Sequence, residues 1–195
     1  MKYVGGLVAL MGLLWSGITL GAPEQPKILE KVTPLPVALS KDFEFRKTKL
    51  YFLSEKAPKA ATSRQTASTL GAKSTSPSKK EYTLQDAPIT FERRYRLFGA
   101  VTALDERQRF GNYFDFFWRA KRMADLTVRF EYRQEKLHDF VQAQEISYRN
   151  VRGTHKTEFK VIGDDYLDDG RVIAWRCSLI ENGRITAENH SYLWE

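Results

Sequence analysis

Hydrophobic and polar residues alternate along several short runs in the second half of the chain. The clearest run is 125–133, whose apolar side chains occupy every second position at Leu126, Val128, Phe130 and Tyr132. Successive side chains of a strand point to opposite sides, so these four share one face and the charged residues between them share the other. Shorter runs on either side show the same pattern. It predicts strands with one buried face and one face in water.

Seven runs of this kind are expected within residues 85–195, with turn residues between them and no long stretch of helical period. The expected strands are 89–98, 112–120, 125–133, 140–148, 157–162, 171–180 and 184–194. Two sheets packed face to face would bury their apolar faces. The sequence therefore predicts an all-β fold.

Seven short antiparallel strands and an inward-facing tryptophan resemble an immunoglobulin-like or fibronectin-type β-sandwich. The resemblance is architectural and covers roughly the last 110 residues. The cysteine pair of true immunoglobulin domains is missing, so no binding residues can be carried over. A small outer-membrane barrel is the structural alternative, but it needs at least eight strands and a lipid-facing apolar band. The charged strand faces argue against it.

The last two expected strands form a hairpin around Asn182 and Gly183. These residues fit a two-residue type I′ loop or a three-residue loop that ends with glycine in a left-handed bulge. We expect the three-residue loop, because it sets Cys177 opposite Ala187 on the apolar face. The two-residue loop would set Cys177 opposite Glu188.

Residues 1–22 begin with one cation and continue as an uncharged, mostly apolar run. This pattern is typical of an export signal or a membrane anchor. Small residues at its end fit cleavage near Gly21 or Ala22, which would leave a periplasmic or secreted protein. The alternative is that residues 4–22 stay as an anchor, although several glycines dilute their apolar content. The only cysteine is Cys177, so lipoprotein anchoring is excluded.

Residues 23–84 read as a flexible basic linker rich in Pro, Ser, Thr and Lys. Residues 57–80 contain five cations, no acid and a single large apolar residue, too little to offset chain entropy by burial. An aromatic island at 41–56 interrupts the linker. We interpret it as an extra strand on the downstream β-sandwich domain at 85–195, and the alternative is a docking segment for a partner.

Charge is divided unevenly along the chain. Residues 1–84 carry 13 Lys and Arg against 6 Asp and Glu, whereas residues 85–195 carry 18 of each. The excess cations of the linker favour weak contact with anionic lipid or another polyanion. The basic clusters at 93–96 and 119–122 have acids close by in sequence and read as solvated faces and sheet rims. No specific nucleic-acid partner is expected.

Four aspartates gather within six residues of one predicted turn: Asp164, Asp165, Asp168 and Asp169. Oxygen-rich turns of this type bind calcium. However, the spacing is not that of an EF-hand, and Asp and Gly are ordinary turn residues. We interpret the four as turn and capping residues that bind no ion, and calcium is the alternative.

The sequence contains no catalytic motif that we recognise: no Gly-rich phosphate loop, GxSxG, HExxH or CxxC. Cys177 falls on the apolar face of its expected strand and should be an inert core residue. No cofactor is expected. These features indicate an exported cell-envelope protein whose head is a non-catalytic binding or scaffolding module for an unknown macromolecule. The alternative is a secreted hydrolase-like enzyme built on a β-sandwich.

Overall fold

The computed structural model describes residues 25–29, 31–55 and 86–194. The expected signal or anchor at 1–22 and segment 57–80 of the expected linker at 23–84 lie outside these residues. The structure is mostly β, with 57% strand and 15% helix. This confirms a mostly β fold, although three helices are also present.

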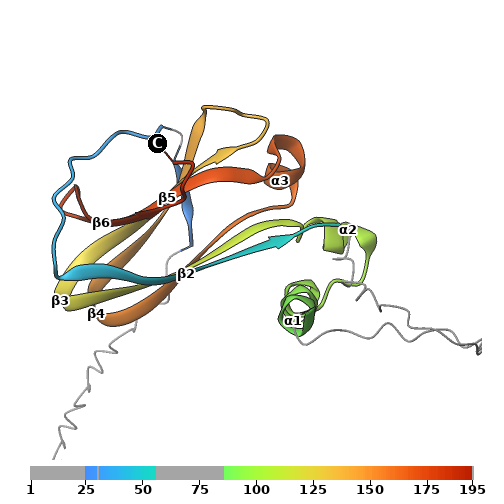
Figure 1. The fold of residues 1–195 in the computed structure, drawn as a ribbon, viewed down its shortest axis with the longest axis horizontal. Coiled ribbons are helices and arrows are strands. Elements are labelled where there is room, and N and C mark those ends of the chain that lie inside the picture. The colour runs from blue at the N-terminus through green and yellow to red at the C-terminus, as the bar shows by residue number, and fades with distance from the viewer. Residues whose placement is uncertain (1–24, 30, 56–85, 195) are drawn as a thin grey trace, which may run out of the picture.

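Six strands and three helices make up the described part of the chain (Figure 1). The strands are β1 (Lys27–Leu29), β2 (Phe43–Leu53), β3 (Gly111–Gln134), β4 (Val141–Ile162), β5 (Val172–Glu181) and β6 (Arg184–His190). The helices are α1 (Asp86–Leu97), α2 (Ala103–Arg107) and α3 (Asp164–Asp169).

The long strands β3 and β4 form the spine of a single antiparallel sheet with the order β1-β4-β3-β5-β6. They pair with each other along nearly their whole length. The first half of β3 also pairs with β2, from Leu53 opposite Gly111 to Phe43 opposite Ala120. Its second half pairs with β5 instead, from Thr127 opposite Ile180. The spine therefore carries different neighbours at its two ends.

Both spine strands bend at the same level. The register between β3 and β4 shifts between Ala120 and Leu126. On β4, Asn150 and Gly153 have φ angles of 53° and 95°, a left-handed conformation that Asn and Gly adopt at least cost. The backbone N–H of Asn150 donates to Oδ1 of Asp125 at 2.6 Å, which fixes the corner. The two halves of the sheet fold toward each other over a common core.

The core is aromatic and joins both halves of the bent sheet. The ring of Phe130, from the second half of β3, lies 4.6 Å from Phe114 and 5.6 Å from Phe116 of the first half. Trp118 is fully buried, and its indole N–H donates to Oγ1 of Thr157 at 2.9 Å. The polar edge of this large ring is thus paired inside the core, as buried N–H groups require.

The N-terminal strands wrap around the sheet. β1 pairs with β4 at one edge, and the carbonyl of Thr33 accepts a hydrogen bond from Arg129 on the outer face of the sheet. Val37 then forms a parallel bridge with Ile185 of β6, and the chain continues into β2. The expectation of an extra strand within 41–56 is confirmed. The sheet also includes residues upstream of 85.

The structure does not confirm the seven-stranded, immunoglobulin-like sandwich. The strands expected separately at 112–120 and 125–133 form one strand, β3. It bends between the two segments, but its pairing with β4 continues on both sides of the bend. The runs at 140–148 and 157–162 likewise belong to β4. The two expected layers are therefore halves of one sheet.

The strand expected at 89–98 is wrong, since this segment is helix α1. Phe91, Tyr95 and Phe98 recur at the spacing of one helix face. Pro88 lies in the first turn, where its missing N–H leaves no helical hydrogen bond unmade.

The expected three-residue hairpin loop is also wrong. Glu181 lies opposite Arg184, so the loop is the two residues Asn182 and Gly183, with φ angles of 49° and 73°. A register shift then follows between Leu179 and Ile180, and Cys177 lies opposite Asn189. Both registers considered from the sequence assumed an unbroken ladder, so neither contained this register shift.

Candidate binding groove along β2

β2 has one paired edge and one open edge. Its pairing with β3 runs the length of the strand. Within the described residues no other strand pairs with it, although the end of β6 lies nearby. Its second row of backbone N–H and C=O groups therefore faces a groove between the two halves of the sheet. We call this the β2 groove and define it by two hollows along the strand.

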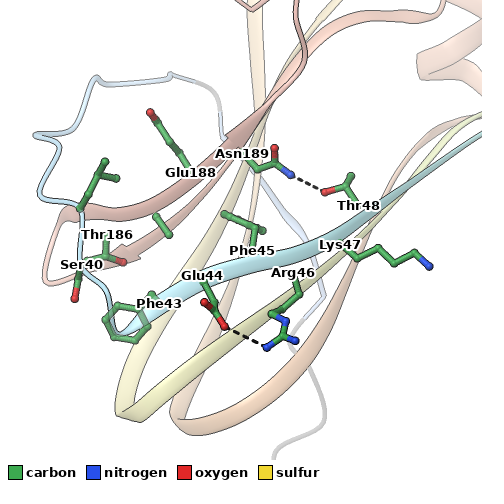
Figure 2. Close-up of a pocket in the computed structure, with 12 residues that line it drawn as sticks. Ser40, Phe43, Glu44, Phe45, Arg46, Lys47, Thr48, Thr186, Glu188 and Asn189 are labelled. Atoms are coloured by element: carbon green, nitrogen blue, oxygen red, sulfur yellow. Dashed lines mark hydrogen bonds and ion pairs between the residues drawn. The ribbon is translucent and has the colours of Figure 1, made fainter.

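The first hollow lies between β2 and β6 and has a volume of about 490 Å³. Figure 2 shows its wall, with a hydrogen bond from Nδ2 of Asn189 to Oγ1 of Thr48 at 2.7 Å crossing from β6 to β2. Segment 36–40 covers the start of β6 by backbone bonds such as Ala38 N–H to the Ile185 carbonyl at 2.8 Å. The side-chain hydrogen bond of Asn189 joins β6 directly to β2 across the groove.

Charges of both signs line this hollow. The carboxylate of Glu44 lies 3.3 Å from Nη1 of Arg46 and 3.8 Å from Nζ of Lys121. Glu188 lines the hollow from β6. Ion pairs as exposed as these contribute little to stability. A surface with mixed charge and free backbone groups suits a polypeptide better than an anionic small molecule.

The second hollow, of about 320 Å³, lies between the end of β2 and the start of β5. Leu50, Phe52 and Ile173 line it and are exposed to solvent. Leu50 and Phe52 occupy alternate positions, so they share one face of β2. This end of the β2 groove presents apolar side chains beside an open strand edge.

The second hollow is open because β6 stops short of it. The last pair of the β5–β6 ladder is Arg176 opposite His190, and Ser191 adds hydrogen bonds to Trp175. No described residue continues this strand beside residues 172–174. The ring of Phe52 packs against Tyr166 of α3 in a T-shaped arrangement, with ring centroids 5.6 Å apart.

The four aspartates all lie within the short helix α3, so the expectation that they are turn and capping residues is wrong: its caps are Gly163 and Gly170, with no side-chain capping bond. Burial, followed by the neighbouring charge of Asp169, raises the pKa of Asp165 above its usual value. Backbone carbonyls of α3 already accept hydrogen bonds from Gln134 and Lys136: Nε2 of Gln134 donates to Asp165 and Gly170, and Nζ of Lys136 donates to Leu167 and Asp168. Among the described residues, no group of three His, Cys, Asp or Glu is arranged to hold a metal ion.

Cys177 is fully buried on β5 within the core, as expected. Burial raises the pKa of its thiol well above the usual range, and the charge of Glu131 acts in the same direction. The nucleophilic thiolate is therefore disfavoured, and the side chain acts as a small core residue.

The histidines with a described hydrogen bond make it to the backbone. His155 stacks on Trp118 at 4.8 Å and contacts the carbonyl of Arg152, and His190 contacts the carbonyl of Ser191. In neither case does a carboxylate orient the ring for general-base chemistry. The hydrolase alternative gains no support from these positions.

The two basic clusters bind other parts of the protein. Arg96 forms ion pairs with Glu92 and Glu158. Arg122 pairs with Asp42 and Glu181 at the opposite end of the sheet. They connect helix α1 and segment 40–42 to the sheet rather than forming one continuous basic surface.

The β2 groove could not be derived from the sequence. Alternation in 43–53 indicated a strand, but an alternating strand can be central or at an edge. The one available signal was the number of charges on β2, since Lys and other charged residues are common on edge strands.

Comparison of this chain with protein families, with curated proteins and with solved structures finds no match. Within the described residues, no helix has the length and apolar character needed to cross a membrane.

Proposed function

We propose that this protein is a non-catalytic binding module that captures an extended polypeptide segment along the open edge of β2. The unpaired edge of this strand, next to exposed apolar side chains, carries the proposal. An extended peptide that adds to such an edge gains main-chain hydrogen bonds, and its alternate side chains enter neighbouring pockets.

The two hollows would contribute different contacts to the bound peptide. At the end of β2, Leu50 and Phe52 offer apolar contact to every second side chain of an added strand. Near its start, Glu44 and Arg46 offer charge pairs of either sign. Main-chain pairing would supply affinity, and the apolar end would supply selectivity for a segment with alternating hydrophobic residues.

The hydrogen bond between Asn189 and Thr48 restricts entry at the middle of the groove. A strand inserted between β2 and β6 must break it, whereas a strand added at residues 50–53 need not. We therefore place the first contact of the partner at the apolar end.

The setting of this module is the cell envelope. The apolar segment at 1–22 supports export, with anchoring by residues 4–22 as the alternative, and the basic segment 57–80 supports weak attraction to anionic lipid or polyanion. The sheet begins with β1 at Lys27, so a head attached through residues 4–22 would lie close to the membrane surface, with segment 57–80 between β2 and α1.

Site-specific photo-cross-linking in intact envelopes tests the proposal. Benzoylphenylalanine in place of Leu50 should form an adduct, and the same group in place of Phe140, exposed on the turn between β3 and β4, should not. The adduct at residue 50 should disappear in the Phe52→Lys background. Adducts of equal yield at both positions, or none at residue 50, would contradict binding along β2.

A further inference from the structure

The ladder between β5 and β6 is interrupted at Ser191, beside the second hollow. The backbone N–H of Ser191 donates to the carbonyl of Trp175 at 2.9 Å, as the next pair of the ladder would. The N–H of Trp175, however, donates to Oγ of Ser191 at 3.0 Å. The carbonyl of Ser191 instead accepts a hydrogen bond from the N–H of Trp194 at 3.1 Å, which closes a turn. A side chain therefore takes over the role of the backbone where the strand ends.

The turn places Trp194 on the face of the sheet opposite the core. Its ring centroid lies 5.0 Å from the guanidinium of Arg133 and 5.2 Å from that of Arg176. An arginine over an indole ring is an attractive cation–π contact. The two contacts hold residues 192–194, which we call the C-terminal strap, away from the second hollow.

The other side chains of the C-terminal strap are apolar and uncovered. Tyr192 is 91% exposed and Leu193 is 64% exposed. If the strap continued the ladder along β5, Leu193 would be level with Ile173, which lines the second hollow. Positions 189, 191 and 193 share one face of a strand, and Asn189 already bonds Thr48 across the β2 groove. Leu193 would therefore point into the hollow, toward the apolar end of β2.

The C-terminal strap cannot occupy both positions at once. In the continued strand, Trp194 would be level with Val172, four positions from Arg176 along β5. This is about 13 Å at the rise of a strand, so the ring would leave Arg176. One segment thus has two discrete arrangements, each with its own contacts, and such a segment can act as a switch.

We propose that the C-terminal strap regulates the β2 groove by competing with the partner for the second hollow. With Trp194 on its two arginines, the hollow is open to the peptide. When Trp194 is released, the strap continues β6 along β5 and Leu193 takes the place of an apolar side chain of the partner. Two cation–π contacts correspond to about a 5- to 30-fold change in the ratio of the two positions. This inference rests on the proposed function, because the strap and the peptide share one site.

Photo-cross-linking within the purified full chain tests the position of the strap without a partner. Benzoylphenylalanine takes the place of Leu50 at the apolar end of β2, and mass spectrometry maps its adducts with residues 192–194. Trp194→Ala releases the strap. The matched control is Tyr192→Ala, which removes an exposed aromatic side chain from the same turn and leaves the contacts of Trp194 in place.

We expect the internal adduct to rise about 5- to 30-fold in Trp194→Ala and to stay unchanged in Tyr192→Ala. It should be lost again when Leu193→Lys is added to Trp194→Ala, because a charged side chain does not enter an apolar hollow. An adduct that does not rise in Trp194→Ala, or that rises equally in Tyr192→Ala, overturns the proposal.

The partner adduct in intact envelopes separates the strap from the proposed function. A chain that ends at Ser191 should give more partner adduct at residue 50 than the full chain, and Trp194→Ala should give less. Equal partner adducts in all three chains overturn the competition. If none of the chains gives a partner adduct, peptide binding along β2 is wrong, and the internal adduct alone then decides whether the strap enters the hollow.

Discussion

Glu131 is a carboxylate buried on the outer side of the sheet, where a strand face normally meets water. Its Oε2 accepts a hydrogen bond from Nε of Arg176 at 2.7 Å, and Oε1 lies 3.8 Å from Nη1 of Arg129. The ring of Trp194 lies 5.2 Å from the guanidinium of Arg176. Removal of this buried charge is costly, because it leaves Arg176 without its carboxylate partner, whereas Arg129 still pairs with Glu145.

We expect Glu131→Gln to lower the free energy of unfolding by about 3 kcal/mol. Denaturant unfolding monitored by tryptophan fluorescence measures this change. The matched control is Glu44→Gln, which removes an exposed pair with Arg46 and should change stability by less than about 0.5 kcal/mol. Equal effects of the two substitutions would show that burial of Glu131 does not matter.

Gly111 begins β3 at a position that only glycine fits. Its φ is 139°, and an added Cβ would lie 2.2 Å from the carbonyl oxygen of Val161. We expect Gly111→Ala to destabilise the fold by about 3 kcal/mol or more, through backbone strain and the displaced strand. Gly153→Ala is the control, because Gly153 also has a positive φ but no atom within 4 Å of an added Cβ. It should cost about 1 kcal/mol, as thermal unfolding of the two variants will show.

At the scale of elements, helix α3 contains a carboxyl group, that of Asp165, whose ionised form is unfavourable in the folded protein. Burial raises the pKa of Asp165 in the folded protein, so the folded state binds this proton more tightly than the unfolded chain. The ionised carboxylate therefore opposes folding above its raised pKa, and this penalty disappears as the pH falls below the ordinary value of 3.8.

Asp165→Asn should accordingly raise the melting temperature at pH 7 relative to the unsubstituted protein, and the gain should shrink as the pH is lowered toward 4. Asp164→Asn is the control, because it removes a charge from the same first turn of α3. Melting curves across this pH range measure both. A gain that is equal for the two variants, or that grows at low pH, would refute the assignment to Asp165.

Elements with strict alternation were predictable from sequence, and those whose shape depends on distant contacts were not. The run at 125–133 is a strand because its period of two is unambiguous. Segment 89–98 has apolar residues that suit either period, and contacts of Arg93 and Arg96 with distant residues hold it as a helix. The bend of β3 depends on its pairing with β4, which no local pattern specifies. The β2 groove depends on where β6 ends, and the sequence does not predict that position.

At the scale of the molecule, the N-terminal strands are part of the folded unit. Phe43 and Leu53 at the two ends of β2 are buried, and Phe43 belongs to the main core cluster. We expect a chain of residues 85–195 to fail to fold cooperatively, although the sequence places the domain there. A chain of residues 25–195 that lacks 57–80 should unfold cooperatively, since it keeps β1, β2 and all the later strands of the sheet.

Circular dichroism and denaturant titration of these two chains check this prediction. The longer chain with Phe43→Ala provides the control, because the loss of this buried ring should destabilise it if β2 is part of the core. Cooperative unfolding of residues 85–195 at unchanged stability would show that β2 is an accessory strand.

The order of strands in the sheet also determines when folding is complete. β1 pairs with residues 143–145, β2 with 111–120, and Val37 with Ile185. β1 and β2 therefore cannot pair until strands that are synthesised much later have been made. Pairings between such distant segments form slowly. The N-terminal strands have no local partner with which to close prematurely on the ribosome. The last strand, β6, supplies the hydrogen-bond partners of segment 36–38, so this part of the fold closes only when nearly all of the chain has been made.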